Sequence, residues 1–315
     1  PDLRQARHTS IIDDIRVWTD EGGARPEIQL RDMLEDLGAR GKRLGVEYNS
    51  YGLTAYNGKA VDAALEGFAV LDDASELVSR VRVVKSPAEL DYVRKAGELG
   101  DASLAAGLDV THAGADEGAI LAAMQGAVFT GGGDYPGNEF IIGSDRDALL
   151  CRYKSGRRTL SDNDQLTLEF AGVYRHYHAA LMRTVVIGQP HSSHIRMFDA
   201  CANALAACEE AMVPGRTAGD VFDAHARVMD EAGLKPHRLN ACGYCLGAKF
   251  TPSWMDWPMF YHGNEAEIGA NMVFFAHMVL MDSDSGNAMT LGRSYIITEQ
   301  GPESLSKAPL ELLSK

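Results

Sequence analysis

The stretch from Asp164 to Gly188 reads DQLTLEFAGVYRHYHAALMRTVVIG and holds the densest set of reactive side chains in the chain. Apolar residues alternate in its first part, which predicts a strand over 166–170. Tyr174 to Tyr177 indicates a bend, after which alternation resumes and predicts a second strand over 179–187. We expect these strands to pair antiparallel and to form the centre of the fold.

Glu169 is the exceptional residue of this hairpin, because it interrupts an apolar strand. A carboxylate is costly to bury without a partner, so the residue is either matched or functional. We expect the pairing to bring Glu169 close to the end of the second strand that carries His178 and Ala180. A structural ion pair with Arg183 is the alternative.

The composition is that of an ordinary globular protein, with 45% hydrophobic and 23% charged residues among 315. A net charge of -14 argues against nucleic acid and against an anionic membrane as partners. No apolar run reaches the length of a membrane span. The five cysteines form no disulfide framework, and no secretory signal is visible, so we expect a cytoplasmic protein. Cys242 and Cys245 are interpreted as small buried residues, with redox or metal binding as the less favoured alternative.

The order of predicted elements divides the chain near residue 85. Residues 1–85 alternate strands and helices, from a short strand at 16–19 onward, which is typical of a sheet covered by helices. Ser86-Pro87-Ala88-Glu89 is a strong helix start. Serine can cap the helix, proline suits the first turn, and the glutamate carboxylate can reach back to the backbone amide of the serine. Beyond it, two helices and then strands follow twice over, with one of these strands predicted at 149–153. This order predicts an α+β fold with a curved sheet and helices outside it.

Residues 86–303 resemble the pita-bread fold of creatinase, prolidase, aminopeptidase P and methionine aminopeptidase. Four motifs carry the resemblance: SPAEL at 86–90, Arg183-Thr184, PGRTAG at 214–219, and Thr298-Glu299 followed by Gly301. The resemblance implies a pita-bread catalytic domain over 86–315. It also implies that residues 1–85 are a creatinase-type N-terminal α/β domain that lacks its first part.

Metal-dependent members of this family hold two metal ions with Asp, Asp, His, Glu and Glu. The flanking motifs place those positions at Glu169, Ala180, Tyr244, His277 and Gly292. Alanine and glycine offer no ligand side chain, so the set does not form a dinuclear carboxylate cage. The resemblance therefore implies no metal, no cofactor and no metallopeptidase activity.

A closer resemblance is to the ectoine hydrolases, through GNEFIIGS at 137–144, LTLEFAGVYRHYHAALMRT at 166–184 and SWMDWPMFYHG at 253–263. It implies metal-independent opening of a cyclic amidine, ectoine or 5-hydroxyectoine, to an N-acetylated 2,4-diaminobutyrate. The catalytic His, Glu and Tyr of creatinase fall here on Arg152, Met182 and His178, so a different substrate is expected.

Seven residues are candidates for the site. Glu169 can pair with the positively charged amidinium and act as nucleophile or as base to water, and His178 can shuttle the proton. The candidates for substrate binding are Tyr244, His277, Arg152, Trp254 and Glu139. Each has a structural alternative: a core histidine, cavity-filling rings, a surface arginine, a core tryptophan and a glutamate that ends a strand.

Three functions remain open from the sequence. The preferred one is an amidine hydrolase that acts on a small molecule. The second is a creatinase-like enzyme with another substrate, and the third is a non-catalytic pita-bread module that binds a protein. The resemblance to creatinase-like proteins implies a homodimer.

Overall fold

The computed structural model describes residues 2–150 and 157–315. The chain divides into two compact units, Pro1–Val78 and Ser79–Lys315. The sequence-based boundary at residue 85 falls shortly after this division.

The first unit is a small α/β arrangement around a two-stranded sheet. Its elements are α1 (Asp2–Thr9), α2 (Pro26–Asp36), β1 (Arg43–Val46), α3 (Ala55–Leu65) and β2 (Val70–Asp73), with α4 (Leu77–Arg82) at the junction. Strands β1 and β2 pair in parallel, and Ala39, Leu65 and Phe68 form their core. The strand predicted at 16–19 is wrong, because Val17 and Trp18 are 60% and 49% exposed and lie in no strand.

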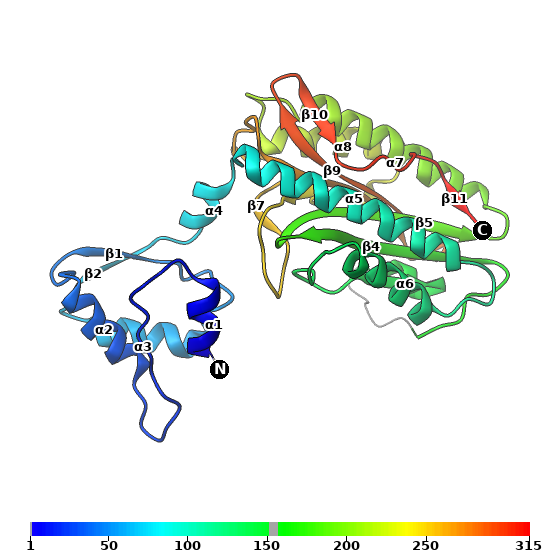
Figure 1. The fold of residues 1–315 in the computed structure, drawn as a ribbon. Coiled ribbons are helices and arrows are strands. Elements are labelled where there is room, and N and C mark those ends of the chain that lie inside the picture. The colour runs from blue at the N-terminus through cyan, green and yellow to red at the C-terminus, as the bar shows by residue number, and fades with distance from the viewer. Residues whose placement is uncertain (1, 151–156) are drawn as a thin grey trace. The chain divides into compact units, whose positions relative to one another are not determined.

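The second unit is α+β, as the sequence predicts (Figure 1). Its elements are α5 (Pro87–Val110), α6 (Glu117–Thr130), β3 (Ile141–Ser144), η1 (Asp145–Leu149), β4 (Asp164–Tyr174), β5 (Tyr177–Ile187), α7 (Ser192–Ala211), α8 (Ala218–Glu231), η2 (Lys235–His237), β6 (Gly243–Cys245), β7 (Asp256–Met259), β8 (Val273–Asp282), β9 (Asn287–Thr298), β10 (Gly301–Ser304) and β11 (Leu313–Ser314). Over the described ranges one sheet has nine strands in the order β3-β4-β5-β9-β8-β6-β7, with β10 beside β9 and β11 beside β5. The strand predicted at 149–153 is wrong at its start, since Leu149 ends a 3-10 helix; residues 151–153 lie outside the described residues.

The start of α5 has the predicted capping box. The Ser86 hydroxyl accepts a hydrogen bond from the Glu89 amide at 3.4 Å, and the Glu89 carboxylate accepts one from the Ser86 amide at 2.7 Å. These two bonds satisfy amides that the first helical turn leaves without partners.

The register of the central hairpin is set by a two-residue turn. Arg175 and His176 both have positive φ angles, 51° and 64°, which is the backbone of a type I′ turn. Glu169 is consequently paired with Met182, and His178 is paired with Val173 near the turn. The expectation that Glu169 lies close to His178 is therefore wrong, because Met182 and His178 are about 13 Å apart along the strand. Ala180 is nearer, since it is the neighbour of Met182 on the same face of β5.

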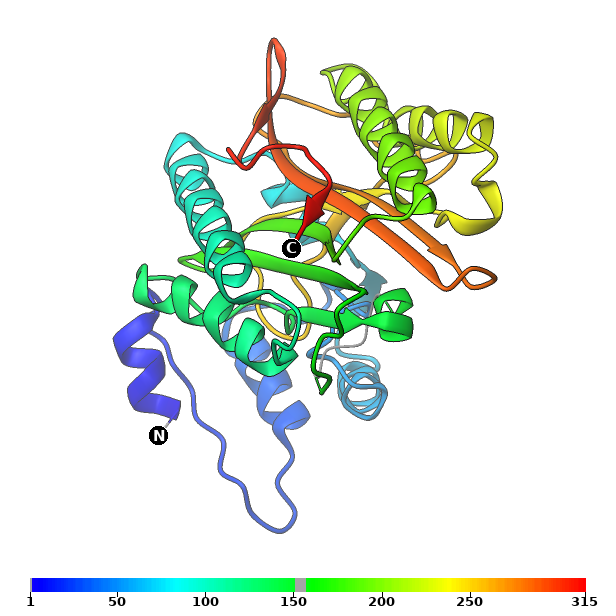
Figure 2. The same cartoon turned by 90° about the vertical axis from the view of Figure 1, so that its right-hand side faces the viewer.

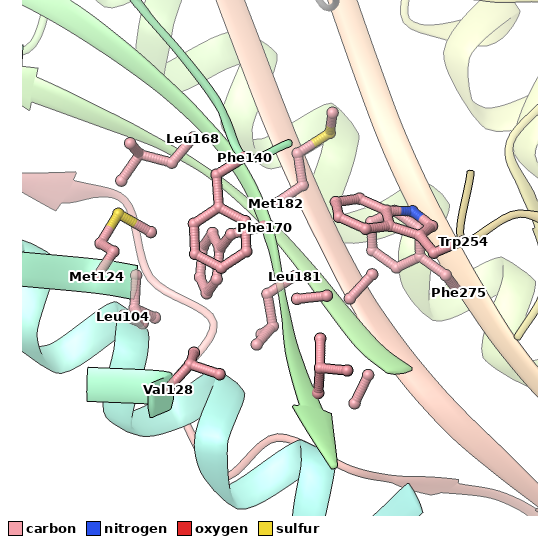
Figure 3. Packing of buried hydrophobic residues seen from close by; sticks show 14 of the residues in the cluster. Leu104, Met124, Val128, Phe140, Leu168, Phe170, Leu181, Met182, Trp254 and Phe275 are labelled. Atoms are coloured by element: carbon pink, nitrogen blue, oxygen red, sulfur yellow. The ribbon is translucent and has the colours of Figure 1, made fainter. Parts of the chain in front are cut away.

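The helices cover the sheet in two pairs, each with its own core. Helices α5 and α6 contribute to the core that contains β4 and β5, whereas α7 and α8 contribute to the core beside β8 and β9 (Figure 2). In the first core Phe140 and Phe170 meet edge to face, with ring centroids 5.9 Å apart, beside Leu181 and Met124 (Figure 3). Among the described helices, none has the length and apolar character needed to cross a membrane.

Candidate active site

A cavity of about 160 Å³ opens on the face of the sheet that carries Glu169. Neighbouring strands bring its base together, because Met182 is paired with Glu169, Gly292 with Met182, and His277 with Gly292. Paired residues of adjacent strands point to the same face, so side chains far apart in sequence meet here. The predicted residues Glu169, Tyr244, His277 and Trp254 all line the cavity.

The polar wall of the cavity is organised by hydrogen bonds. The Trp254 indole Nε1–H donates to the Tyr244 hydroxyl at 2.8 Å, and that hydroxyl donates to Glu169 Oε1 at 3.4 Å. Tyr244 and Trp254 are 4% and 1% exposed, so these bonds lie largely away from water. Low local polarity strengthens such bonds.

Most of the remaining wall is apolar, although Asn138 and His277 also line it. The apolar part includes thioether and aliphatic side chains from five segments: Ile141, Met182, Leu239, Met255, Met259 and Val279. Methionine fills irregular spaces and is polarisable, which suits contact with a methyl group or a delocalised flat cation. The site therefore combines one carboxylate and a few other polar side chains with a largely apolar surround.

A larger depression, about 390 Å³, lies at the other end of β4 and β5. Its lining includes Asp145, Asp164, His191 and Asn287, and it includes none of the predicted site residues. Its buried carboxylate, Asp164, already accepts hydrogen bonds from the Asp145 and Ser161 amides and pairs with Arg158 at 3.4 Å, so it is committed to structure. The cavity at Glu169 is accordingly the candidate active site.

His178 does not line this cavity, although it lies on the same face of β5. It is fully buried, and its Nε2 accepts a hydrogen bond from the Gly137 amide at 2.8 Å. Because an amide can only donate, the ring proton lies on Nδ1, which is 3.3 Å from the Gly247 carbonyl oxygen. Burial lowers the pKa of His178 to about 4. This geometry favours the structural alternative, a neutral histidine that fixes the backbone at Gly137, over the predicted proton shuttle.

Three further predictions concern charged residues around the site. Arg183 is paired with Leu168 and thus points to the opposite face from Glu169, so the structural ion pair between Arg183 and Glu169 is not formed. Glu139 is exposed and lies outside the residues that line the cavity, whereas its neighbour Asn138 lines it. Arg152 lies outside the described residues.

Sequence reasoning missed several residues of the cavity, among them Asn138, Met255 and Met259. Asn138 is adjacent to the predicted Glu139, and only the local backbone decides which of the two faces inward. The methionines lie in the SWMDWPM stretch at 253–259, where the alternation of tryptophan and methionine was the available signal.

Of the five positions that the resemblance assigns to metal ligands, Glu169, Tyr244 and His277 line the cavity, and the side chains at the five positions do not fit a pair of metal ions. Ala180 has no donor atom. A Cβ atom added at Gly292 would lie 2.7 Å from the Phe275 ring and 2.9 Å from the Met182 Cβ, so the space for a carboxylate is filled. In residues 2–150 and 157–315 no group of three or more His, Cys, Asp or Glu side chains is placed to hold a metal ion.

The sequence matches known proteins over nearly its full length. The model of the family described as metallopeptidase family M24 matches residues 91–299. The ectoine hydrolase of Halomonas elongata is 28% identical over 322 aligned positions, which cover 96% of this chain and 79% of that protein.

Solved structures of peptidases superpose closely on the chain. The prolidase of Thermococcus sibiricus gives a TM-score of 0.87 at 17% identity and covers 100% of this chain and 83% of its own. The X-Pro aminopeptidase of Thermotoga maritima gives 0.86 at 18% identity, with coverages of 99% and 83%. At these identities the two structures establish the pita-bread fold and nothing about the reaction.

Proposed function

The chain belongs to metallopeptidase family M24, and we propose that within this family it is a hydrolase that opens the cyclic amidine ring of ectoine without a metal ion. The observation that carries the proposal is the partly buried carboxylate of Glu169 in a mostly apolar cavity, where the described residues bring together no metal-binding group of three or more His, Cys, Asp or Glu side chains. The similarity to the Halomonas elongata ectoine hydrolase supports the choice of substrate.

The shape and lining of the cavity support a small, flat and positively charged substrate. Ectoine is a six-membered ring with a delocalised amidinium and a methyl group on the carbon between the two nitrogens. Glu169 can pair with the amidinium, and the methionine side chains offer an apolar surface for the methyl group. A cavity of about 160 Å³ has room for one such molecule.

The proposed reaction adds one water molecule across a carbon–nitrogen bond. Glu169 either attacks the amidine carbon or removes a proton from the water that attacks it. The tetrahedral carbon then expels one nitrogen, which takes a proton. In the route where Glu169 attacks, water next cleaves the bond between the carbon and the Glu169 oxygen; in both routes the carbon remains on the other nitrogen as an acetamide. The substrate already carries the positive charge, so its carbon is electrophilic without a Lewis acid.

Side-by-side assays test the choice of substrate. Purified protein is incubated with ectoine, creatine and an Xaa-Pro dipeptide, and each reaction is followed by proton NMR. We expect a new acetamide methyl signal from ectoine alone. Cleavage of the dipeptide, with no ring opening of ectoine, would replace this proposal by a peptidase.

Detection of a covalent adduct distinguishes Glu169 as a nucleophile from Glu169 as a general base. A nucleophile leaves ectoine attached to the protein in acid-quenched samples, and mass spectrometry of the peptide that contains Glu169 detects it. A general base leaves no adduct on that peptide under any quench time.

We further propose that 5-hydroxyectoine is accepted as substrate and that the protein is a cytoplasmic homodimer. The four described cysteines, Cys201, Cys208, Cys242 and Cys245, are free and buried, which suits a reducing compartment. Light scattering of the purified protein tests the dimer, and a monomer mass at micromolar concentration would contradict it.

A further inference from the structure

We propose that Trp254 and Tyr244 form a directional hydrogen-bond relay that holds the Glu169 carboxylate in its reactive orientation. Both side chains are thus positioning residues for the reaction, a role that differs from stacking on the substrate. The inference rests on the proposed function for its kinetic test, but its geometry is tested separately.

The direction of the relay follows from the chemistry of its groups. An indole N–H can only donate, so the Tyr244 oxygen must accept the 2.8 Å bond from Trp254 Nε1. The single hydroxyl hydrogen is then left for another acceptor, and Glu169 Oε1 lies 3.4 Å away. An ionised carboxylate only accepts, so the order Trp254 to Tyr244 to Glu169 is the one that satisfies all three groups.

The first member of the relay is fixed by the surrounding backbone. The Trp254 amide donates to Asn138 Oδ1 at 3.3 Å. A Cβ added at Gly137 would lie 2.8 Å from the Trp254 amide nitrogen, so glycine permits the close approach of these two segments. His178 in turn accepts from the Gly137 amide. Trp254 is 1% exposed and therefore has little freedom to turn its indole N–H elsewhere.

The relay orients the Glu169 carboxylate. A glutamate side chain has several rotatable bonds, and a displacement of about 1 Å at a reacting group can cost about 100-fold in rate. A donor directed at one carboxylate oxygen restricts the orientation of the group, and both proposed roles of Glu169 depend on that orientation.

Kinetics of single and double variants test the relay. We expect Tyr244→Phe to lower kcat for ectoine about 10- to 100-fold with a smaller change in KM, the range for loss of a hydrogen bond to a charged group. Trp254→Phe should lower kcat as well. In the Tyr244→Phe background, however, Trp254→Phe should change kcat less than about twofold, because its effect passes through the missing hydroxyl. If the effects of the two substitutions on kcat multiply in the double variant, or if Tyr244→Phe leaves kcat unchanged, the relay is overturned.

Trp257→Phe is the matched control. Trp257 lies outside the cavity lining and packs on Arg80, whose guanidinium carbon is 4.2 Å from its ring. Loss of this indole should leave kcat unchanged.

Indole signals in a ¹H–¹⁵N NMR spectrum test the geometry without any substrate. The chain has three tryptophans, so three indole N–H signals are expected, and Trp254→Phe identifies its own. Tyr244→Phe should shift that signal, while those of Trp18 and Trp257 stay in place. An unmoved Trp254 signal would overturn the relay. A moved signal in a wild-type protein that does not open ectoine would support the relay and reject the proposed function.

Discussion

Gly292 determines whether a second carboxylate can stand beside Glu169. The family resemblance places one of the metal-ligand positions here, but the Phe275 ring and Met182 fill the space next to its Cα. A larger side chain at this position therefore requires a change in the packing around it.

The packing of Phe275 against Gly292 can be tested by comparing the free energies of unfolding of single and double variants. Gly292→Ala should lower the free energy of unfolding by about 1–3 kcal/mol, because the new Cβ would approach the Phe275 ring to 2.7 Å. In a Phe275→Leu background the same substitution should cost clearly less. Denaturant unfolding of the four proteins gives both costs, and equal costs in the two backgrounds would show that Phe275 does not fill this space.

The buried, neutral His178 predicts a specific pH dependence. Its folded-state pKa of about 4 lies below the ordinary value of 6.5, so between these values the unfolded chain binds the extra proton. The neutral His178 therefore makes its full contribution to the free energy of unfolding above pH 6.5. About 3 kcal/mol of that contribution is lost as the pH falls toward 4.

His178→Gln supplies the comparison, since a neutral amide can accept from Gly137 and does not titrate. Its stability relative to the wild type should improve by about 3 kcal/mol between pH 6.5 and 4, measured by urea unfolding. A constant difference across that range would contradict the assigned neutral state of His178.

Helix α5 lies so close to strand β4 that two glycines meet at the contact. A Cβ added at Gly172 would lie 1.9 Å from the Ala96 carbonyl oxygen and 2.2 Å from the Gly100 amide nitrogen. Both distances involve backbone atoms, which cannot move without displacing the helix. This contact positions the strand that carries Glu169.

Two glycine-to-alanine substitutions contrast this contact with an open position. Gly172→Ala should destabilise the protein by about 3 kcal/mol or more. Gly126→Ala, in α6, meets no atom within 4 Å and should stabilise it by up to about 1 kcal/mol, because alanine favours the helix. Thermal unfolding of both variants gives the comparison, and a tolerated Gly172→Ala would contradict the close packing of α5 on β4.

The long helices and the central hairpin were predictable because local signals define them. The capping box at Ser86 gives the start of α5, and alternation gives β4 and β5. Strand β9 is harder to predict, because its first part, Asn287 to Ser294, includes asparagine, glycine and arginine, which are poor or neutral strand formers. Its neighbours in the sheet hold it in place, and a single sequence does not reveal them.

The site was predictable where a residue belongs to a recognisable motif and unpredictable where contacts decide its role. Glu169, Tyr244, His277 and Trp254 were predicted and line one cavity. The geometry does not favour the predicted role of His178, because the strand register, set by the turn at Arg175 and His176, pairs it with Val173 and not with Glu169. The strand register follows from the geometry of the turn. Arg175-His176 is not a sequence that predicts a type I′ turn, so the register could not be predicted from it.

At the level of the complete chain, one fold of family M24 supports two kinds of chemistry in our account. The strands present the same row of positions in each case, and the side chains at those positions decide whether metal ions or a single carboxylate act on the substrate. The peptidases that share the fold at 17–18% identity therefore do not determine the reaction of this chain.

The most direct test of this account is the rate of ectoine ring opening by chelator-treated protein, with metal content measured on the same sample. We predict that the wild-type rate is unchanged when metal falls well below one ion per chain, that added Mn²⁺ or Zn²⁺ does not raise it, and that Glu169→Gln abolishes it while the protein stays folded. A rate that falls with the metal content and returns on addition of the ion would contradict a metal-free reaction at Glu169.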